Sequence, residues 1–170
     1  MGIFTYLALT VSMATMYGVG AFTSDWDTAF DFKCLQGRAL NYIHSDYGKF
    51  FKDRKWELFC RSVGATSACE QSDYVNEFNK PFNYVCPLNK VLTGIASINS
   101  DVHEDRRFKF QCCKITGKNP IGCHLTDYVN DWEKKMNFTT LPGKVLNGAN
   151  SIYDKDHQDR RWKFSICNVQ

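Results

Sequence analysis

Polar and hydrophobic residues alternate one by one near the end of the chain. Two sets interleave between positions 160 and 167: Arg160, Trp162, Phe164 and Ile166 with Arg161, Lys163, Ser165 and Cys167. Successive side chains of a β-strand point to opposite faces, so this period of two predicts a half-buried strand. Residues 91–99 are rich in β-branched side chains, and residues 100–104 supply turn chemistry. The pattern therefore predicts strand–turn–strand hairpins.

The alternating segment is repeated three times. Its hexapeptide reads DRKWEL at 53–58, DRRFKF at 105–110 and DRRWKF at 159–164. A second element, Ser or Thr followed by Asp and an aromatic residue, begins at positions 24, 72 and 126, and we expect 73–78 and 127–132 to form short helical turns. A glycine-containing apolar run at 90–94 and 144–148 has a degraded counterpart at 38–42. The repeats are therefore about 25–60, 73–113 and 127–167.

Three such repeats can build one core. A lone hairpin is marginal in water, whereas three hairpins that pack their apolar faces together are not. Residues 22–170 are enough for a single domain. We predict an all-β, disulfide-stapled domain with approximate threefold symmetry, β-trefoil-like or β-prism-like.

The start of the chain and its cysteines indicate secretion. The apolar run from Ile3 to Met16 is too short to span a bilayer and ends in small residues, so residues 1–21 are predicted to be a signal peptide. A hydrophobic helix buried in the fold is the alternative. Eight cysteines and one N-glycosylation sequon at Asn137 suit an oxidising, extracellular compartment. No later segment is apolar enough to span a membrane.

Repeat equivalence constrains the disulfides. Cys34 and Cys60 are the local partners in the first repeat, and Cys86 and Cys112 are their counterparts in the second. The remaining cysteines then pair by the same logic. The predicted bridges are Cys34–Cys60, Cys86–Cys112, Cys69–Cys113 and Cys123–Cys167. Cys112 and Cys113 are adjacent on a strand, so their side chains point to opposite faces and should have different partners. An exchange of those two partners is the main alternative.

The hexapeptide has two faces with different candidate roles. An Arg and an aromatic residue two positions apart can stack, and the preceding Asp can pair with the guanidinium. We interpret the Asp, Arg and aromatic residues of the three hexapeptides as a structural frame of the repeats. The alternative is that the aromatic residues line an exposed groove on which sugar rings stack. The frame residues are Asp53, Arg54, Trp56, Asp105, Arg106, Phe108, Asp159, Arg160 and Trp162. The opposite face carries basic residues that can grip sulfate or carboxylate groups, unless it is an ordinary solvated face. These are Lys55, Arg107, Lys109, Arg161 and Lys163.

Other chemistry has little support. The net charge of +3 does not indicate a nucleic-acid binder. The acidic turn with Asp154, Asp156 and Asp159 offers oxygen ligands for Ca²⁺, but turn formation explains it as well, so we predict no metal and no cofactor. Sequence signatures of hydrolases, zinc proteases and phosphate loops are missing, and we predict no enzyme activity.

The repeated Asp-Arg-x-aromatic motif, with Cys112-Cys113 ending the middle copy, resembles the dermatopontin family over residues 25–167. The chain departs from that family in three ways: it lacks the vertebrate members' additional cysteine pair and acidic, Tyr-rich amino-terminal arm, and it has Phe108 where the motif prefers Trp. The resemblance implies adhesion or matrix organisation, with binding to proteoglycans, sulfated sugars or cell surfaces.

Three functional hypotheses follow. The leading one is a secreted extracellular-matrix or adhesion protein that binds proteoglycans, sulfated glycans or cell-surface glycoconjugates multivalently, in one chain or a homo-oligomer. The second is a lectin or agglutinin of innate immunity, with or without Ca²⁺. The third is a structural matrix component without a soluble ligand.

Overall fold

The computed structural model describes residues 21–170, which form twelve strands and no helix. The strands are β1 (Ala21–Thr23), β2 (Phe30–Lys33), β3 (Arg38–Gly48), β4 (Asp53–Ser62), β5 (Thr66–Gln71), β6 (Phe82–Val85), β7 (Lys90–Ser100), β8 (Asp105–Ile115), β9 (Pro120–Leu125), β10 (Met136–Thr139), β11 (Lys144–Asp154) and β12 (Asp159–Val169). The predicted signal peptide lies, except for its last residue, outside the described residues. Within 21–170 no helix of membrane-spanning length and hydrophobicity is found.

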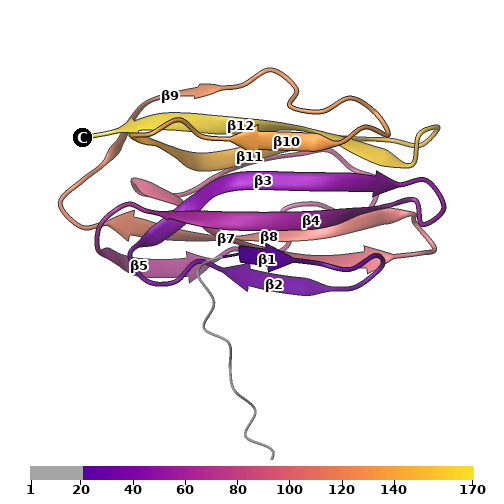
Figure 1. The fold of residues 1–170 in the computed structure, drawn as a ribbon, viewed down its shortest axis with the longest axis horizontal. Coiled ribbons are helices and arrows are strands. Elements are labelled where there is room, and N and C mark those ends of the chain that lie inside the picture. Colours follow the sequence, from indigo (N-terminus) through magenta and orange to yellow (C-terminus); the bar gives the residue numbers. More distant parts are fainter. Residues whose placement is uncertain (1–20) are drawn as a thin grey trace, which may run out of the picture.

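Each repeat contributes one long hairpin, and each hairpin is the centre of a four-stranded antiparallel sheet. The first sheet has the order β1-β4-β3-β10, the second β2-β7-β8-β5 and the third β6-β11-β12-β9. The long strands run along the longest dimension of the molecule (Figure 1). The three hairpin turns lie together at one end, which we call the turn end, and the C-terminus lies at the other, which we call the open end.

The short edge strands connect the repeats in a cycle. Strand β2 of the first repeat pairs with β7 of the second, and β6 of the second pairs with β11 of the third. Strand β10 of the third repeat returns to pair with β3 of the first, for example Phe138 opposite Ile43. Each sheet therefore needs a strand from another repeat.

The inward faces of the three hairpins meet in one core. Along β4 the residues Arg54, Trp56, Leu58 and Cys60 are buried, while the residues between them are half-exposed. Trp56, Phe108 and Trp162 contact one another edge to face, with ring centroids 4.9 to 5.9 Å apart. Such pairs are worth about 0.5–1.5 kcal/mol beyond the area they bury. The predicted all-β fold with approximate threefold symmetry is confirmed, with three separately hydrogen-bonded sheets.

Four disulfides staple the domain, and no cysteine among residues 21–170 is free. The bridges are Cys34–Cys60, Cys69–Cys113, Cys86–Cys112 and Cys123–Cys167. Each bridge closes a loop with a separation of 26 or 44 residues, worth roughly 3–4 kcal/mol on the chain-entropy model. Cys112 reaches inward to Cys86, whereas Cys113 reaches Cys69, so the exchanged pairing is not the one in the structure.

The segments 73–78 and 127–132 contain bends and turns rather than the short helical turns that the sequence predicts. Their polar groups bond to a neighbouring strand instead. The Asn76 side-chain oxygen accepts the backbone N–H of Phe108 at 3.0 Å, and the Asn130 oxygen accepts that of Trp162 at 2.9 Å. Each segment therefore runs along the edge of a strand and bonds to it. The backbone N–H groups of Val75 and Val129 donate to the carbonyl oxygens of Phe108 and Trp162 instead of forming a helical turn.

The first repeat is shorter than the other two in this region. Trp26 stacks on Phe51 as Phe78 stacks on His103 and as Trp132 stacks on His157. Trp26 is therefore the counterpart of Phe78 and Trp132, and not of Tyr74 and Tyr128 as the shared Ser/Thr-Asp-aromatic pattern suggests. Among residues 21–170, no aromatic ring contacts Lys55 as Tyr74 contacts Arg107 and as Tyr128 contacts Arg161.

Candidate functional site

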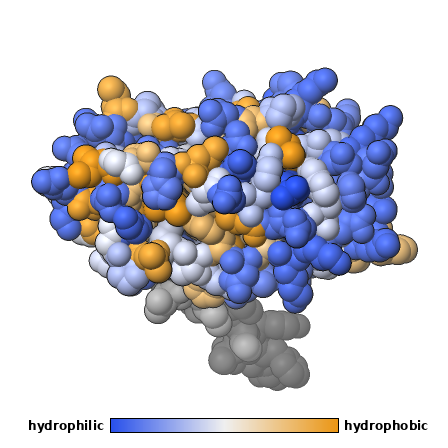
Figure 2. Space-filling view, turned by 90° about the horizontal axis from the view of Figure 1, so that it is seen from above, coloured by the Kyte–Doolittle hydropathy of each residue, from blue (hydrophilic) through white to orange (hydrophobic). Residues whose placement is uncertain are grey.

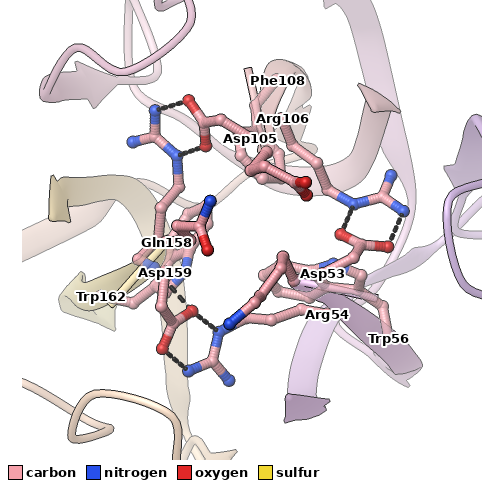
Figure 3. Close-up of a pocket in the computed structure, with 12 residues that line it drawn as sticks. Asp53, Arg54, Trp56, Asp105, Arg106, Phe108, Gln158, Asp159 and Trp162 are labelled. Carbon is pink, nitrogen blue, oxygen red and sulfur yellow. Dashed lines mark hydrogen bonds and ion pairs between the residues drawn. The ribbon is translucent and has the colours of Figure 1, made fainter. Parts of the chain in front are cut away.

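The Asp and Arg of the hexapeptides form a closed ring of ion pairs between repeats (Figure 3). Arg54 donates to both carboxylate oxygens of Asp159 at 2.7 Å. Arg106 binds Asp53 in the same way at 2.6 Å, and Arg160 binds Asp105 at 2.6 and 2.7 Å. Each repeat thus gives its Asp to one neighbour and its Arg to the other.

The ring also holds the loops that lead into the edge strands. Asp53, Asp105 and Asp159 accept backbone N–H groups from Asp27, Asn79 and Glu133, respectively. The three guanidinium groups donate to the carbonyl oxygens of Thr28, Lys80 and Lys134. All six ring side chains are at most 4 % exposed. Every buried charge therefore has a partner and additional hydrogen bonds, which is the condition under which burial of an ion pair is tolerated.

The space on the ring axis is too small for a sugar. A cavity of about 20 Å³ lies between the ion pairs and the aromatic trio, with Lys52, Glu104 and Gln158 around its mouth. That volume holds about one water molecule. Burial, with the nearby Asp101 carboxylate, raises the pKa of Glu104 above its ordinary value. Trp56, Phe108 and Trp162 are each 1 % exposed and offer no stacking groove. The geometry favours the structural interpretation of these nine residues.

The outward faces of the second and third sheets carry a different arrangement of cations. The Arg107 guanidinium lies over the Tyr74 ring at 4.3 Å, and the Lys109 ammonium lies 4.5 Å from the same ring. In the third sheet Arg161 and Lys163 take the same positions around Tyr128, at 4.1 and 4.5 Å. We call these the two cation–tyrosine faces.

The arginines of these faces are held firmly, whereas the lysines are not. Arg107 donates to the Asn76 carbonyl at 3.0 Å and to Glu77 at 3.0 Å. Arg161 donates to the Asn130 carbonyl at 3.1 Å and lies 3.5 Å from Asp131. Within residues 21–170, no ion pair engages Lys109 or Lys163. Each face thus presents a half-exposed ammonium group beside a tyrosine ring.

In the part of the chain that the structure describes, the first sheet has no such face. Lys55 lies 3.6 Å from Asp25, and Glu57 stands two residues further along the same strand, where the other sheets have lysine. Strand β1 pairs alongside, with Thr23 opposite Glu57. Lys55 is therefore not brought together with a second cation. A shorter spacing could have distinguished the first repeat in the sequence: Trp26 lies 27 residues before Asp53, whereas Tyr74 lies 31 residues before Asp105.

An open hollow of about 400 Å³ lies beside the cation–tyrosine face of the second sheet. Tyr74 and Lys109 form part of its wall together with Asp31, Gln71 and Ser97. Asp31 comes from the first repeat and Ser97 from the second, so the hollow depends on the exchange of edge strands. The sequence did not assign Tyr74, Asp31 or Gln71 to a site. Asp31 reaches the hollow through the exchanged strand β2, whereas Gln71 is placed by the pairing of β5 with β8.

The acidic turn of the third hairpin does not form a cluster of ligands. Asp159 belongs to the buried ring, and Asp154 accepts backbone N–H groups from Asp156 and His157. The bonds from His157 hold the pKa of Asp154 below its ordinary value. Across residues 21–170, no three His, Cys, Asp or Glu side chains are grouped so that they can hold a metal ion.

The fold and the ring define a class of protein: a disulfide-bonded β-domain in which three Asp-Arg-x-aromatic repeats close into a cycle. The sequence model of the family described as Dermatopontin matches residues 24–170. The chain therefore belongs to the dermatopontin family, whose members are not enzymes.

Relatives cover most of the chain. It is 41 % identical to a dermatopontin of Biomphalaria glabrata over 81 % of this chain and 93 % of the relative. It is 32 % identical to the hemagglutinin/amebocyte aggregation factor of Limulus polyphemus over 88 % of each. Identity to human dermatopontin is 25 % over 82 % of this chain and 73 % of the relative. No solved structure matches the chain.

Proposed function

We propose that this chain is a secreted extracellular-matrix or cell-adhesion protein that binds sulfated or otherwise anionic glycans multivalently. The observation that carries the proposal is the duplicated cation–tyrosine face, in which Tyr74 and Tyr128 each contact an arginine and a lysine. Buried frame residues are repeated three times, whereas this exposed arrangement is repeated twice.

The chemistry of the face suits an acidic sugar. The tyrosine ring contacts both cations and holds them side by side, and the lysine offers three N–H donors to a sulfate or carboxylate. The hollow beside Tyr74 adds Asp31, Gln71 and Ser97 as partners for hydroxyl groups. Proteoglycans, sulfated glycans and cell-surface glycoconjugates carry all of these groups and are the proposed partners.

Multivalency follows from the arrangement of the faces. They lie on different sheets of one rigid, disulfide-bonded body, so one long glycan or two neighbouring glycans can engage both. Linked weak sites give an avidity about 10²–10⁴ times that of one site where the geometry allows both to bind. The Limulus relative is named for haemagglutination and aggregation of amebocytes, and such bridging requires at least two binding sites on each agglutinin molecule or oligomer. A homo-oligomer would multiply the faces further.

Secretion is supported by the cysteines and by the position of the sequon. All eight cysteines are paired, and disulfides persist in extracellular proteins but not in the cytosol. Asn137 is exposed on β10 of the first sheet, opposite His44. A glycan on Asn137 would project from the one sheet that lacks a cation–tyrosine face, and would leave the other two sheets uncovered.

The test is retention on immobilised heparin. The double variant Arg107→Ala plus Lys109→Ala is expected to elute at clearly lower salt than the wild type, because one of two faces is lost. Lys49→Ala plus Lys155→Ala, on the turns of the first and third hairpins, removes the same charge and is the matched control. If the two double variants elute at the same salt concentration, the cation–tyrosine face is not a specific site, and net charge alone explains the retention.

A lectin or agglutinin that clumps cells or microbes is the second candidate, and the Limulus relative favours it. Agglutination of red cells with and without a Ca²⁺ chelator separates the two forms of this hypothesis. Agglutination that persists in the chelator supports a Ca²⁺-independent agglutinin. Silence on a glycan array would instead favour a structural matrix component without a soluble ligand.

A further inference from the structure

The open end of the molecule is rich in cations that have no acidic partner. Equivalent basic residues begin the three central hairpins at this end: Arg38, Lys90 and Lys144. Lys90 is buried and pairs with Glu70 at 2.6 Å. Within residues 21–170, no ion pair engages five other cations of this end. They are Arg38, Arg61, Lys114, Lys118 and Lys144.

Three of these cations line one hollow. Arg61 at the end of β4, Lys118 after β8 and Lys144 at the start of β11 surround a space of about 220 Å³. Ser62, Gly64 and Gly143 form further parts of the wall, and no acidic residue lines it. The three cations come from three different repeats or their connections, so the hollow exists only in the closed cycle.

The side chains of this hollow are held by the protein. The Arg61 guanidinium donates through Nη2 to both the carbonyl and the hydroxyl oxygen of Thr140, on the loop after β10. A guanidinium has five N–H donors, so the Nε and Nη1 groups of Arg61 remain for a ligand. The Lys144 ammonium contacts the side-chain oxygen of Asn168. Two of the three cations are therefore positioned before any ligand binds.

The floor of the hollow strengthens its electrostatics. Val145 and Val169 line it, and they pack with the apolar cluster at this end that includes Ala39, Val91 and Ile115. An apolar floor lowers the local dielectric and so increases the attraction between the cations and a bound anion. In the view of Figure 2, hydrophobic residues are more frequent toward the open end and hydrophilic ones toward the turn end.

We propose that this hollow binds a sulfate ester group of an extracellular polysaccharide. Three cations around one small space match a compact oxyanion with several acceptor oxygens, and guanidinium is well suited to such an anion. The hollow is smaller than the roughly 300–1,000 Å³ of sites for drug-sized ligands, so it takes one charged group with part of its sugar. The proposal rests on the proposed function for the class of ligand, but it shares no residue with the cation–tyrosine faces.

This site would give the molecule a third, separate contact with a polyanion. The cation–tyrosine faces lie on the sides of the second and third sheets, whereas the hollow lies at the open end. A chain that holds sulfated glycan at its end and at its sides links different strands of a matrix without any need to oligomerise. Because the hollow lies at the open end and the cation–tyrosine faces lie on the sides, binding at the hollow would set how the molecule is oriented on the glycan.

The test uses a size-defined heparin hexasaccharide and isothermal titration calorimetry. Lys118→Glu is chosen because Lys118 is exposed and makes no side-chain ion pair among residues 21–170, so the change should not disturb folding. Lys155→Glu, exposed on the turn of the third hairpin, makes the same change of charge at the other end and is the matched control. Reversal of one exposed charge at a site is expected to weaken binding about three- to tenfold. The control is expected to bind within about twofold of the wild type because salt screens distant charges.

The outcomes separate this site from the cation–tyrosine faces. Weaker binding by Lys118→Glu alone supports the hollow, and weaker binding by Arg107→Ala plus Lys109→Ala, measured with the same hexasaccharide, supports the faces. If Lys118→Glu and Lys155→Glu weaken binding equally, the effect is one of net charge and the hollow is not a site. If Lys118→Glu binds as well as the wild type while Arg107→Ala plus Lys109→Ala binds more weakly, the proposal that the hollow binds sulfate is wrong and the proposed function stands.

Discussion

Adjacent residues with the same chemistry have opposite roles in this protein. Arg106 is buried and bound to Asp53 in the ring, whereas Arg107 lies on the outward face over Tyr74. The alternation of a β-strand separates them, because successive side chains point to opposite faces. The buried arginine of the ring needs its carboxylate partner, whereas the outward arginine contributes chiefly to the surface.

At this scale we predict that breaking one ion pair of the ring is costly. Arg106→Met leaves the Asp53 carboxylate buried without its partner, so the free energy of unfolding should fall by about 3–5 kcal/mol. Arg107→Met on the same strand is the matched control and should cost about 1 kcal/mol or less. Urea denaturation of both variants measures the difference.

The pair Asp53→Leu and Arg106→Met tests the cause of that cost. If uncompensated charge is responsible, the double variant should lose clearly less free energy of unfolding than the two single variants together, with a coupling of about 1–3 kcal/mol. Additive losses would contradict the ion-pair explanation and point to packing alone.

At the scale of elements, the close approach of edge strands explains the repeated glycines. Each central hairpin has a register shift in its first strand, and Gly94 and Gly148 follow it in the second and third sheets. A Cβ atom would lie 2.6 Å from the Phe32 carbonyl oxygen at Gly94 and 2.6 Å from the Tyr84 oxygen at Gly148. Tyr42 stands at this place in the first sheet and packs edge-on against Phe59 at 5.0 Å. The degraded first copy of the apolar run is therefore a structural variant of the same element.

We predict that Gly94→Ala destabilises the domain by about 1–3 kcal/mol, since backbone atoms must move to admit the new methyl group. Gly148→Ala should have a similar cost. Gly117→Ala is the comparison, because a Cβ there meets no atom within 4 Å and the substitution tests only its positive φ of 72°. Thermal unfolding by circular dichroism measures all three. A Gly94→Ala variant as stable as the wild type would contradict the steric explanation.

At the scale of the whole molecule, stability belongs to the cycle and not to any repeat. Each sheet borrows an edge strand from another repeat, and each ring arginine binds the aspartate of another repeat. Removal of one repeat opens a sheet, breaks two ion pairs and exposes the aromatic trio. This mutual dependence also positions the open-end hollow, whose cations come from separate parts of the chain.

We predict that the oxidised protein unfolds in a single cooperative transition. The sheets cannot melt one at a time, because each loses a strand when its neighbour opens. Tryptophan fluorescence reports the core at Trp56 and Trp162, and far-ultraviolet circular dichroism reports the strands, so their denaturant midpoints should coincide. Two separated transitions would show that the repeats unfold independently.

Local structure could be predicted from the sequence alone. The period of two from Arg160 onward predicted the strands, and the three hexapeptides predicted the threefold arrangement, because both signals depend only on neighbours in the chain. Equivalent spacing also predicted the four disulfides, but the partners of Cys112 and Cys113 could still be exchanged, and that choice came from the structure. The separation of a frame face from a basic face followed from the same alternation.

Contacts between residues of different repeats could not be predicted from the sequence and came from the three-dimensional structure. The sequence contains Asp53 and Arg106 but not their pairing, because the direction of the cycle depends on how the sheets pack. The shared Ser/Thr-Asp-aromatic pattern aligned Trp26 with Tyr74, although Trp26 lies 27 residues before Asp53 and Tyr74 lies 31 before Asp105, and the aromatic stacking in the structure corrected that alignment. The hollow between Arg61, Lys118 and Lys144 was likewise invisible, because segments distant in the chain become neighbours only when the third repeat closes onto the first.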